Sequence, residues 1–312
     1  MVATPPVVLT IAGFDPSSGA GITADIKVIA AHECYGVACA TALTVQSTQG
    51  VRRVHGVDAG VIAETLAELA SDFTIGAVHI GMLGNEAVAL AVADFLAQTK
   101  LPHVVLDPIL RSTSGADLID WAGTKVMIER LIPLCELVTP NLEEAGVLCR
   151  ANSDTSGAQP VEVDALSSRR VEAASSAESI EAMRTAARGM HSLGAANVVI
   201  TGGHLEKAID LLSFTTSRGI EQELFKAERQ KSTSTHGTGC AFSTALACHL
   251  AHGRGLPEAA LLSKAYVSAA IANAQPLGHG AGPLNHLYRM HERRRPGNVV
   301  SEAEPAHAHA RR

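Results

Sequence analysis

Aromatic residues are scarce in this chain of 312 residues: only 3% are Phe, Trp or Tyr, although 46% are hydrophobic. A buried core must therefore consist mainly of Ala, Val, Leu and Ile, which suits close packing of helices on a sheet. The sequence also lacks a long basic stretch interleaved with aromatic residues, and its formal net charge is −6. This charge and composition argue against a nucleic-acid partner.

Long apolar runs are absent as well. The first residues, MVATPPVVLTIAG, do not combine a basic leader with an extended apolar segment, and no stretch is long enough to cross a bilayer. The six cysteines lack the C-x-x-C spacing of metal sites, and a chain of this size needs no disulfides to support its core. We therefore expect a cytoplasmic protein with reduced thiols and no membrane partner.

Short runs rich in β-branched residues predict six strands, most of them apolar on both faces. They lie at residues 7–12, 37–45, 77–81, 103–107, 136–140 and 197–201. Helical stretches alternate with them at residues 21–34, 61–71, 86–99, 142–150 and 180–193, with a final pair that begins at Cys240 and Leu256. The alternation predicts an α/β fold with a doubly wound, mostly parallel central sheet and helices on both faces.

Residues 1–295 are expected to form a single domain. Residues 151–179 interrupt the alternation with a segment rich in Ser, Ala and charge, which predicts a flexible surface excursion. Residues 215–223 resemble a hairpin turn, and the tail 296–312 is expected to be disordered. Ligands bind at the carboxyl ends of the strands in doubly wound sheets, so the loops after the strands are the places to search for a site.

The most distinctive loop, THGTGC, precedes the helix that begins at Cys240. Gly237, Thr238 and Gly239 can point successive N–H groups into one concavity at the positive end of that helix, where a phosphate would bind. A tight turn that only caps the helix explains the same spacing. Cys240 is either a small buried side chain or a reactive thiol whose pKa the helix end lowers.

Three other strand ends carry groups that suit a flat heterocycle. The loop AGFDPSSGAGITADIK leaves room beside Gly13, and its Asp25 can accept hydrogen bonds from an amino group, or can simply compensate a helix dipole. Gln46 can bond to a ring edge or satisfy a turn. Met82, in IGMLGN, can pack on a ring or belong to the core.

Two further strand ends carry hard oxygen donors. VVLDPIL contains Asp107, and VTPNLEEAG contains Asn141 and Glu144. Mg²⁺ takes few protein ligands and keeps several waters, so two carboxylates near a phosphate suffice to bind it. Asn and Glu are also common caps at helix starts. Beside a glycine-rich anion loop, the set indicates a magnesium site with Asp107 and Glu144 as ligands.

The sequence resembles the hydroxymethylpyrimidine kinase and phosphomethylpyrimidine kinase family of thiamine biosynthesis, within the ribokinase superfamily. The resemblance extends from about residue 7 to 282 and rests on seven motifs in the family's order: TIAGFDPSSGAGITADIK, ALTVQSTQGV, IGMLGN, VVLDPIL, VTPNLEEA, GGHLE and THGTGCAFSTALA. It implies a ribokinase-like fold and ATP-dependent phosphorylation of 4-amino-5-hydroxymethyl-2-methylpyrimidine and of its monophosphate. It also implies ATP and Mg²⁺ as cofactors, and we expect a homodimer.

The resemblance also implies roles for the candidate residues. Those lining the aminopyrimidine pocket would be Gly13, Asp25, Gln46 and Met82. Gly237, Thr238 and Gly239 would surround the transferred phosphoryl group. Cys240 would accept the proton of the attacking hydroxyl. Those on the metal and nucleotide side would be Glu144, which holds Mg²⁺ through water, together with Asp107, Asn141 and Thr201.

Three departures from the family's pattern qualify these roles. Thr201 stands where lysine is common, Phe14 replaces a usual Ser or Thr at the pocket mouth, and the 151–179 excursion is longer than the usual connection. Two other functions fit the same pocket, namely pyridoxal kinase activity and pyrimidine binding without catalysis. Asp25 favours the aminopyrimidine, since pyridoxal lacks an exocyclic amine, while Thr201 is the feature that favours a silent binding protein.

Overall fold

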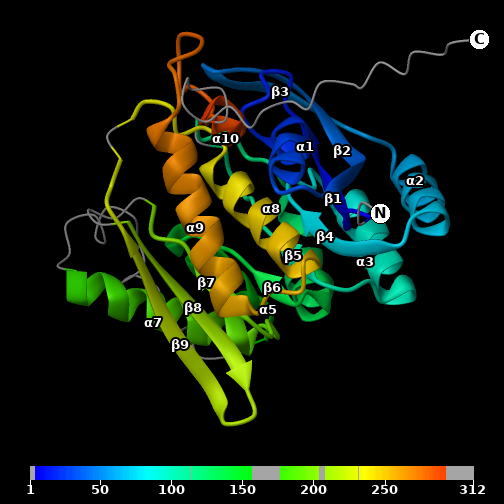
Figure 1. The fold of residues 1–312 in the computed structure, drawn as a ribbon. Coiled ribbons are helices and arrows are strands. Elements are labelled where there is room, and N and C mark those ends of the chain that lie inside the picture. Colours follow the sequence, from blue (N-terminus) through cyan, green and yellow to red (C-terminus); the bar gives the residue numbers. More distant parts are fainter. Residues whose placement is uncertain (1–3, 113, 157–175, 204–207, 231, 293–312) are drawn as a thin grey trace, which may run out of the picture.

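A single mixed sheet runs through the computed structural model, which describes residues 4–112, 114–156, 176–203, 208–230 and 232–292. In this part of the chain the sheet has nine strands in the order β3-β2-β1-β4-β5-β6-β7-β8-β9 (Figure 1). The strands are β1 (Val7–Phe14), β2 (Tyr35–Ser47), β3 (Gly50–Gly56), β4 (Ile75–Ile80), β5 (Val104–Leu106), β6 (Leu137–Val138), β7 (Val198–Ile200), β8 (Ala208–Thr216) and β9 (Gly219–Ala227).

The six predicted strands form the parallel centre of this sheet, from β2 through β1 and β4 to β7. Adjacent side chains on these strands point to opposite faces and are both buried, as in the pairs Val8 with Leu9 and Val104 with Val105. Strands buried on both faces are typically near-continuous apolar runs. This confirms the predicted α/β fold with a mostly parallel sheet.

Helices cover both faces of the sheet. The first layer consists of α1 (Gly21–Ala31), α8 (Thr238–Ala251) and α9 (Leu256–Ala272), of which α8 and α9 cross the face nearer the viewer in Figure 1. The second consists of α2 (Ala59–Asp72), α3 (Glu86–Thr99), α5 (Leu142–Ser156) and α7 (Ser176–Ser192), with the short α4 (Trp121–Val126) beside α3. No helix of the described residues has both the length and the apolar composition needed to cross a bilayer.

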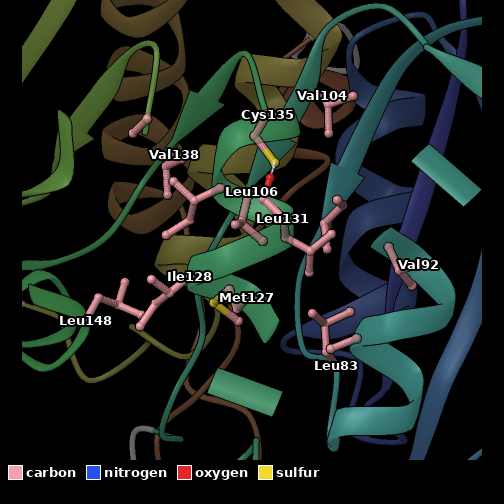
Figure 2. Close-up of a cluster of buried hydrophobic side chains, with 14 of the residues drawn as sticks. Leu83, Val92, Val104, Leu106, Met127, Ile128, Leu131, Cys135, Val138 and Leu148 are labelled. Atoms are coloured by element: carbon pink, nitrogen blue, oxygen red, sulfur yellow. Dashed lines mark hydrogen bonds between the residues drawn. The ribbon is translucent and has the colours of Figure 1, made fainter. Parts of the chain in front are cut away.

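The larger core lies between the sheet and the second layer of helices. Figure 2 shows part of it, with Leu106 and Val138 from the sheet facing Met127 and Leu131, which belong to a π-helical turn after α4 (Met127–Leu131). All four side chains are fully buried. Aliphatic side chains and methionine therefore fill the space that aromatic rings occupy in many cores, as the composition predicts.

Three parts of the fold differ from the sequence prediction or add to it. The predicted turn at residues 215–223 belongs to the antiparallel hairpin of β8 and β9, and β3 pairs antiparallel with β2 at the opposite edge. Helices α5 and α7 extend into both ends of the predicted 151–179 excursion. The remainder of that excursion and the predicted tail 296–312 lie outside the described residues.

We expect Leu131→Ala to lower the free energy of unfolding by about 2–5 kcal/mol, because it removes a fully buried side chain and leaves a cavity. Leu134→Ala is the matched control: that side chain is 40% exposed, and we expect a change of less than about 0.5 kcal/mol. Urea denaturation measures both. Equal effects of the two substitutions would contradict the assignment of Leu131 to the core.

Candidate functional site

A cavity of about 400 Å³ opens at the carboxyl ends of the parallel strands. All twelve residues that the sequence analysis selected line it. They are Gly13, Asp25, Gln46, Met82, Asp107, Asn141, Glu144, Thr201, Gly237, Thr238, Gly239 and Cys240. The structure thus brings together seven segments that are up to 227 residues apart, from Gly13 to Cys240, as expected for strand ends that share one edge of a sheet.

The loop between β1 and α1 is organised by Asp15, which the sequence analysis did not select. Its Oδ1 accepts hydrogen bonds from the backbone N–H and the hydroxyl of Ser17, at 2.8 and 2.7 Å. Its Oδ2 accepts from the backbone N–H groups of Gly19 and Ala20, at 3.2 and 3.0 Å. One buried carboxylate therefore satisfies several donors of the turn and fixes the wall of the cavity next to Gly13.

His236 joins this first loop to the glycine-rich turn before α8. Its Nε2 lies 2.9 Å from Asp15 Oδ2 and 3.2 Å from Gln46 Nε2. Gly19 packs directly beneath the imidazole, and a methyl group there would collide with the ring. The two loops and Gln46 therefore form one connected wall, although Asp15 and His236 are 221 residues apart in sequence.

Asp25 lies at the base of this wall and is completely buried. Its Oδ2 accepts a hydrogen bond from Thr10 Oγ1 at 2.7 Å, and its Oδ1 accepts one from Thr244 Oγ1 at 2.9 Å. Oδ2 also faces Nδ1 of His79 at 3.5 Å, whereas Oδ1, with two lone pairs, retains the capacity to accept one more hydrogen bond. Direct contact between Asp25 and a substrate stays a prediction.

The glycine-rich turn leads straight into α8, which begins at Thr238, two residues earlier than predicted. Gly237 precedes the helix in a left-handed conformation, with φ of 82°, and lies against the backbone of Gly19, so only glycine fits there. The first N–H groups of a helix have no partner within it, and the helix dipole is positive at that end. The geometry thus supports an anion site at Gly237, Thr238 and Gly239.

For Cys240, the sequence analysis left two roles open: a small buried side chain, or a reactive thiol whose pKa the helix start lowers. A helix start lowers the pKa of a thiol, but burial raises the pKa of Cys240 well above its usual value, and the nearby carboxylates of Asp107 and Asp25 raise it further. Desolvation and negative charge outweigh the helix dipole because this side chain is buried. These surroundings therefore favour the neutral form of the Cys240 thiol, and its role as a proton acceptor stays a prediction.

Asp107 and Glu144 supply the oxygen donors on the next strand ends. Burial raises the pKa of Asp107 to about 6, while burial and the nearby Asp107 raise the pKa of Glu144 to about 8. Asn141 and Glu144 also form a reciprocal capping box at the start of α5: each side chain accepts from the other residue's backbone N–H at 2.9 Å. The capping alternative is thus confirmed, and it leaves Glu144 Oε1 outside the box.

These two carboxylates fit a magnesium ion. Their raised pKa values indicate that the surrounding residues supply too little positive charge for both carboxylates to ionise readily. The described residues contain no cluster of three or more side chains arranged to hold a metal by themselves. Mg²⁺ does not need one, because it is commonly bound by one or two carboxylates together with water and substrate phosphates.

The far side of the cavity is bordered by β7, β8 and α9. Thr201 follows β7. Beside it lies a buried ion pair, in which Lys264 Nζ and Asp210 Oδ2 are 2.6 Å apart. Asp210 Oδ1 accepts a hydrogen bond from the backbone N–H of Gly202 at 3.0 Å, which holds the pair next to Thr201. Phe242 and Val267 add an apolar surface. This side therefore offers an apolar wall and an ammonium group, although Thr201 itself carries no charge.

Comparison with known proteins gives consistent matches over most of the chain. The sequence profile of the family described as phosphomethylpyrimidine kinase matches residues 15–174 and 161–285. The thiamine biosynthesis bifunctional protein ThiED of Geobacter sulfurreducens is 40% identical over 282 residues, which cover 90% of this chain and 52% of that protein. The chain thus spans about half the length of that relative.

Two further matches cover nearly the whole of the other protein. The hydroxymethylpyrimidine/phosphomethylpyrimidine kinase of Haemophilus influenzae is 34% identical over 284 residues, which cover 89% of this chain and 96% of that one. Among solved structures, the ADP complex of Bacillus subtilis pyridoxal kinase superimposes with a TM-score of 0.74 at 30% identity, and the match covers 92% of this chain and 100% of that one.

We expect Asp15→Asn to lower the free energy of unfolding at pH 7 by about 1–3 kcal/mol, since an amide cannot replace the acceptor oxygen that faces Gly19, Ala20 and His236. Burial raises the pKa of Asp15, but the hydrogen bonds from His236, Ser17 and Ala20 lower it by more, to below its usual 3.8. The ionised carboxylate therefore stabilises the folded protein above about pH 4, and this stabilisation is lost as the pH falls through the folded pKa.

The difference between wild type and Asp15→Asn should accordingly shrink below about pH 4, as measured by urea denaturation across pH. Asp58→Asn is the matched control, because Asp58 is an exposed helix cap and Asn caps equally well. A difference that stays constant down to pH 3 would show that the charge of Asp15 does not hold the loop.

Proposed function

The chain belongs to the phosphomethylpyrimidine kinase family, and from this premise we propose that it transfers the γ-phosphoryl group of ATP to 4-amino-5-hydroxymethyl-2-methylpyrimidine, and then to the monophosphate, in thiamine biosynthesis. One observation supports this proposal most strongly. Asp25 and Gln46 form a polar wall that suits a small heterocycle, and this wall lies in the same cavity as the N-terminus of α8. An acceptor hydroxyl and a phosphoryl group can meet between them.

The heterocycle would bind against β1, β2 and the loop after β4. Asp25 and Gln46 would accept from and donate to its polar edge, while Met82 would pack on the ring. Met82 is buried, and its sulfur lies so close to Gly13 that a side chain at position 13 would displace it. Gly13 therefore keeps the cavity wide enough for a flat ring at this point.

The transferred phosphoryl group would lie against Gly237, Thr238 and Gly239. Phosphoryl transfer requires mainly positioning and stabilisation of charge, which N–H groups at a helix start supply without rearrangement. The new bond forms between the acceptor oxygen and the γ-phosphorus, the bond from that phosphorus to the bridging oxygen of ADP breaks, and the acceptor proton leaves. Cys240, on the first turn of α8, would receive this proton.

A neutral thiol cannot accept that proton, so Cys240 must ionise before transfer. The negative charge of Asp107 is one cause of its raised pKa. Mg²⁺ held by Asp107 and Glu144 would neutralise charge on these carboxylates and on the nucleotide phosphates. Binding of the metal therefore acts in the direction that lowers the pKa of the Cys240 thiol, and Cys240 would act as a base only with the metal bound.

ATP would extend from this point toward Asn141, Thr201 and the apolar wall on α9. Thr201 is uncharged, but the ammonium group of Lys264 is one positive charge near this end of the cavity. Its pairing with Asp210 fixes its position. ATP is thus proposed as the phosphoryl donor, in keeping with the kinase family and with the ADP bound in the Bacillus subtilis structure.

Two features beyond the site belong to the same proposal. One sheet contributes every strand end that lines the cavity, which supports a single ribokinase-like domain over residues 1–295. At one edge of the sheet, where β2 pairs with β3, Leu43 and Val45 of β2 are exposed, each with at least half of its surface accessible to solvent. Apolar side chains on a sheet edge favour contact with another chain, which supports the proposed homodimer.

Pure protein with ATP and Mg²⁺ should release ADP only when hydroxymethylpyrimidine is added, and phosphorus NMR should identify first the monophosphate and then the diphosphate. Pyridoxal is the competing acceptor, because the Bacillus subtilis neighbour is a pyridoxal kinase. We expect a lower kcat/KM for pyridoxal, since it has no exocyclic amine for Asp25. A higher kcat/KM for pyridoxal would identify pyridoxal as the substrate instead. Binding of the pyrimidine without any turnover would indicate a binding protein without kinase activity.

Cys240→Ala should lower kcat by about 10²- to 10⁴-fold, the usual contribution of a general base, and should change the Kd of the pyrimidine far less. Steady-state kinetics and calorimetry measure the two quantities. Cys248→Ala is the matched control: Cys248 is a buried cysteine on the same helix that does not line the cavity. Equal losses of kcat in the two variants would indicate that Cys240 contributes packing rather than proton transfer.

A further inference from the structure

An arginine on the loop after β5 lines the cavity. This residue, Arg111, follows shortly after Asp107 in the sequence. In the sheet, β5 lies between β4, which Met82 follows, and β6, which Glu144 follows. A parallel sheet presents the residues at its strand ends in the order of its strands. The loop with Arg111 therefore leaves the sheet between the pyrimidine side and the metal side of the proposed site.

Hydrogen bonds in both directions hold this loop beside the cavity. Toward the metal side, the backbone N–H of Leu110 donates to the carboxylate of Glu144. Toward the pyrimidine side, the backbone N–H of Val51 in β3 donates to Ser114 Oγ at 3.4 Å. The loop thus connects the start of α5 with the β2–β3 edge of the sheet, and Arg111 lies between these two contacts in the sequence.

An acidic neighbour orients the guanidinium group of Arg111. Its Nε donates to Asp117 Oδ1 at 2.8 Å, and the two residues form an antiparallel bridge across the loop. Arginine has five N–H donors, so the four on the terminal nitrogens can bind an oxyanion. The Arg111 side chain is 65% exposed, which makes it accessible to a ligand from solution. Exposed ion pairs of this kind contribute little to stability.

The charge balance of the cavity makes a cation at this place useful. Three carboxyl groups line the cavity, those of Asp25, Asp107 and Glu144. A phosphate monoester carries about 1.5 to 2 negative charges at pH 7. The monophosphate acceptor would therefore enter against like charges, whereas the hydroxymethyl group of the first acceptor carries no charge. Positive charge beside the acceptor helps the second phosphorylation and not the first.

Among the described residues, three lysines and arginines line the cavity: Arg111, Arg229 and Lys264. Arg229 follows β9, and Lys264 of α9 pairs with Asp210 of β8. Strands β8 and β9 form the edge of the sheet that is remote from β1, β2 and β4, where the pyrimidine would bind. Of these three cationic groups, Arg111 is thus the one that leaves the sheet next to the strand end of Met82.

We propose that Arg111 binds the phosphate group of the monophosphate acceptor in the second phosphorylation. A guanidinium group is planar and can donate two parallel hydrogen bonds to phosphate oxygens, which gives orientation as well as charge. This inference rests on the proposed function for the identity of the acceptor. A phosphate of the nucleotide has the same chemistry, so the experiment measures the acceptor and the nucleotide separately.

Calorimetry without ATP tests the contact directly. We expect Arg111→Gln to raise the Kd of hydroxymethylpyrimidine monophosphate by about 10- to 100-fold, the loss typical of hydrogen bonds to a charged group. The Kd of unphosphorylated hydroxymethylpyrimidine should stay within about twofold of wild type. Arg111→Lys keeps the charge but loses the paired hydrogen bonds, so its Kd for the monophosphate should lie between those of wild type and Arg111→Gln.

Steady-state kinetics separate the acceptor from the nucleotide. In Arg111→Gln, the KM for the monophosphate should rise, while the KM for ATP, measured with hydroxymethylpyrimidine as acceptor, should not change. Arg130→Gln is the matched control, because Arg130 is also an exposed arginine paired with an aspartate, Asp94, at 2.8 Å but does not line the cavity. It should leave all these constants within about twofold of wild type.

Two results would overturn the role of Arg111. Unchanged or equally weakened binding of the two pyrimidines in Arg111→Gln would exclude a specific contact with the acceptor phosphate. A raised KM for ATP with unchanged binding of the monophosphate would assign Arg111 to the nucleotide instead. The binding measurements involve no turnover, so they decide this role independently. Failure of the wild-type protein to phosphorylate hydroxymethylpyrimidine would instead refute the proposed function.

Discussion

The desolvation of negative charge at the carboxyl edge of the sheet governs the rest of this site. Asp25 and Asp107 are buried there, with Glu144 nearby. Water stabilises ionised carboxylates far better than a protein interior does, so each needs hydrogen-bond donors or a cation. Asp25 has hydroxyl donors and His79, whereas Asp107 and Glu144 have raised pKa values because their compensation is incomplete.

The same constraint links segments far apart in the sequence. The carboxylates of Asp15 and Asp25 are satisfied partly by His236 and Thr244, which lie 221 and 219 residues further along the chain. The wall on the pyrimidine side and the start of α8 are therefore held together by hydrogen bonds to buried carboxylates. A displacement of either loop would leave such a group without a partner, which is a large cost in a buried site. The phosphoryl turn and the pyrimidine wall thus keep one relative position.

The fold and the location of the site followed from the sequence because both depend on local patterns. The six central strands are mostly apolar runs, so they were recognisable, whereas β3 (GVRRVHG) is a partly polar edge strand and was missed. Residues at strand ends could be selected in advance because a parallel sheet gathers them. The hydrogen-bond partners could not, since Asp15 with His236 and His79 with Ser243 are pairs that only the tertiary structure creates.

Cys240 shows most clearly why the sequence alone could not predict the pKa of a side chain at a helix start. The helix start that lowers a thiol pKa was visible in the sequence, but the burial and the two carboxylates that raise it were not. Burial and the charges of Asp107 and Asp25 favour the neutral thiol, so positive charge would have to be added nearby before Cys240 could act as a base. A nucleotide alone would add only negative charge. In the proposed mechanism, a divalent cation that arrives with the nucleotide would supply the missing positive charge, and the carboxylates of Asp107 and Glu144 would receive it.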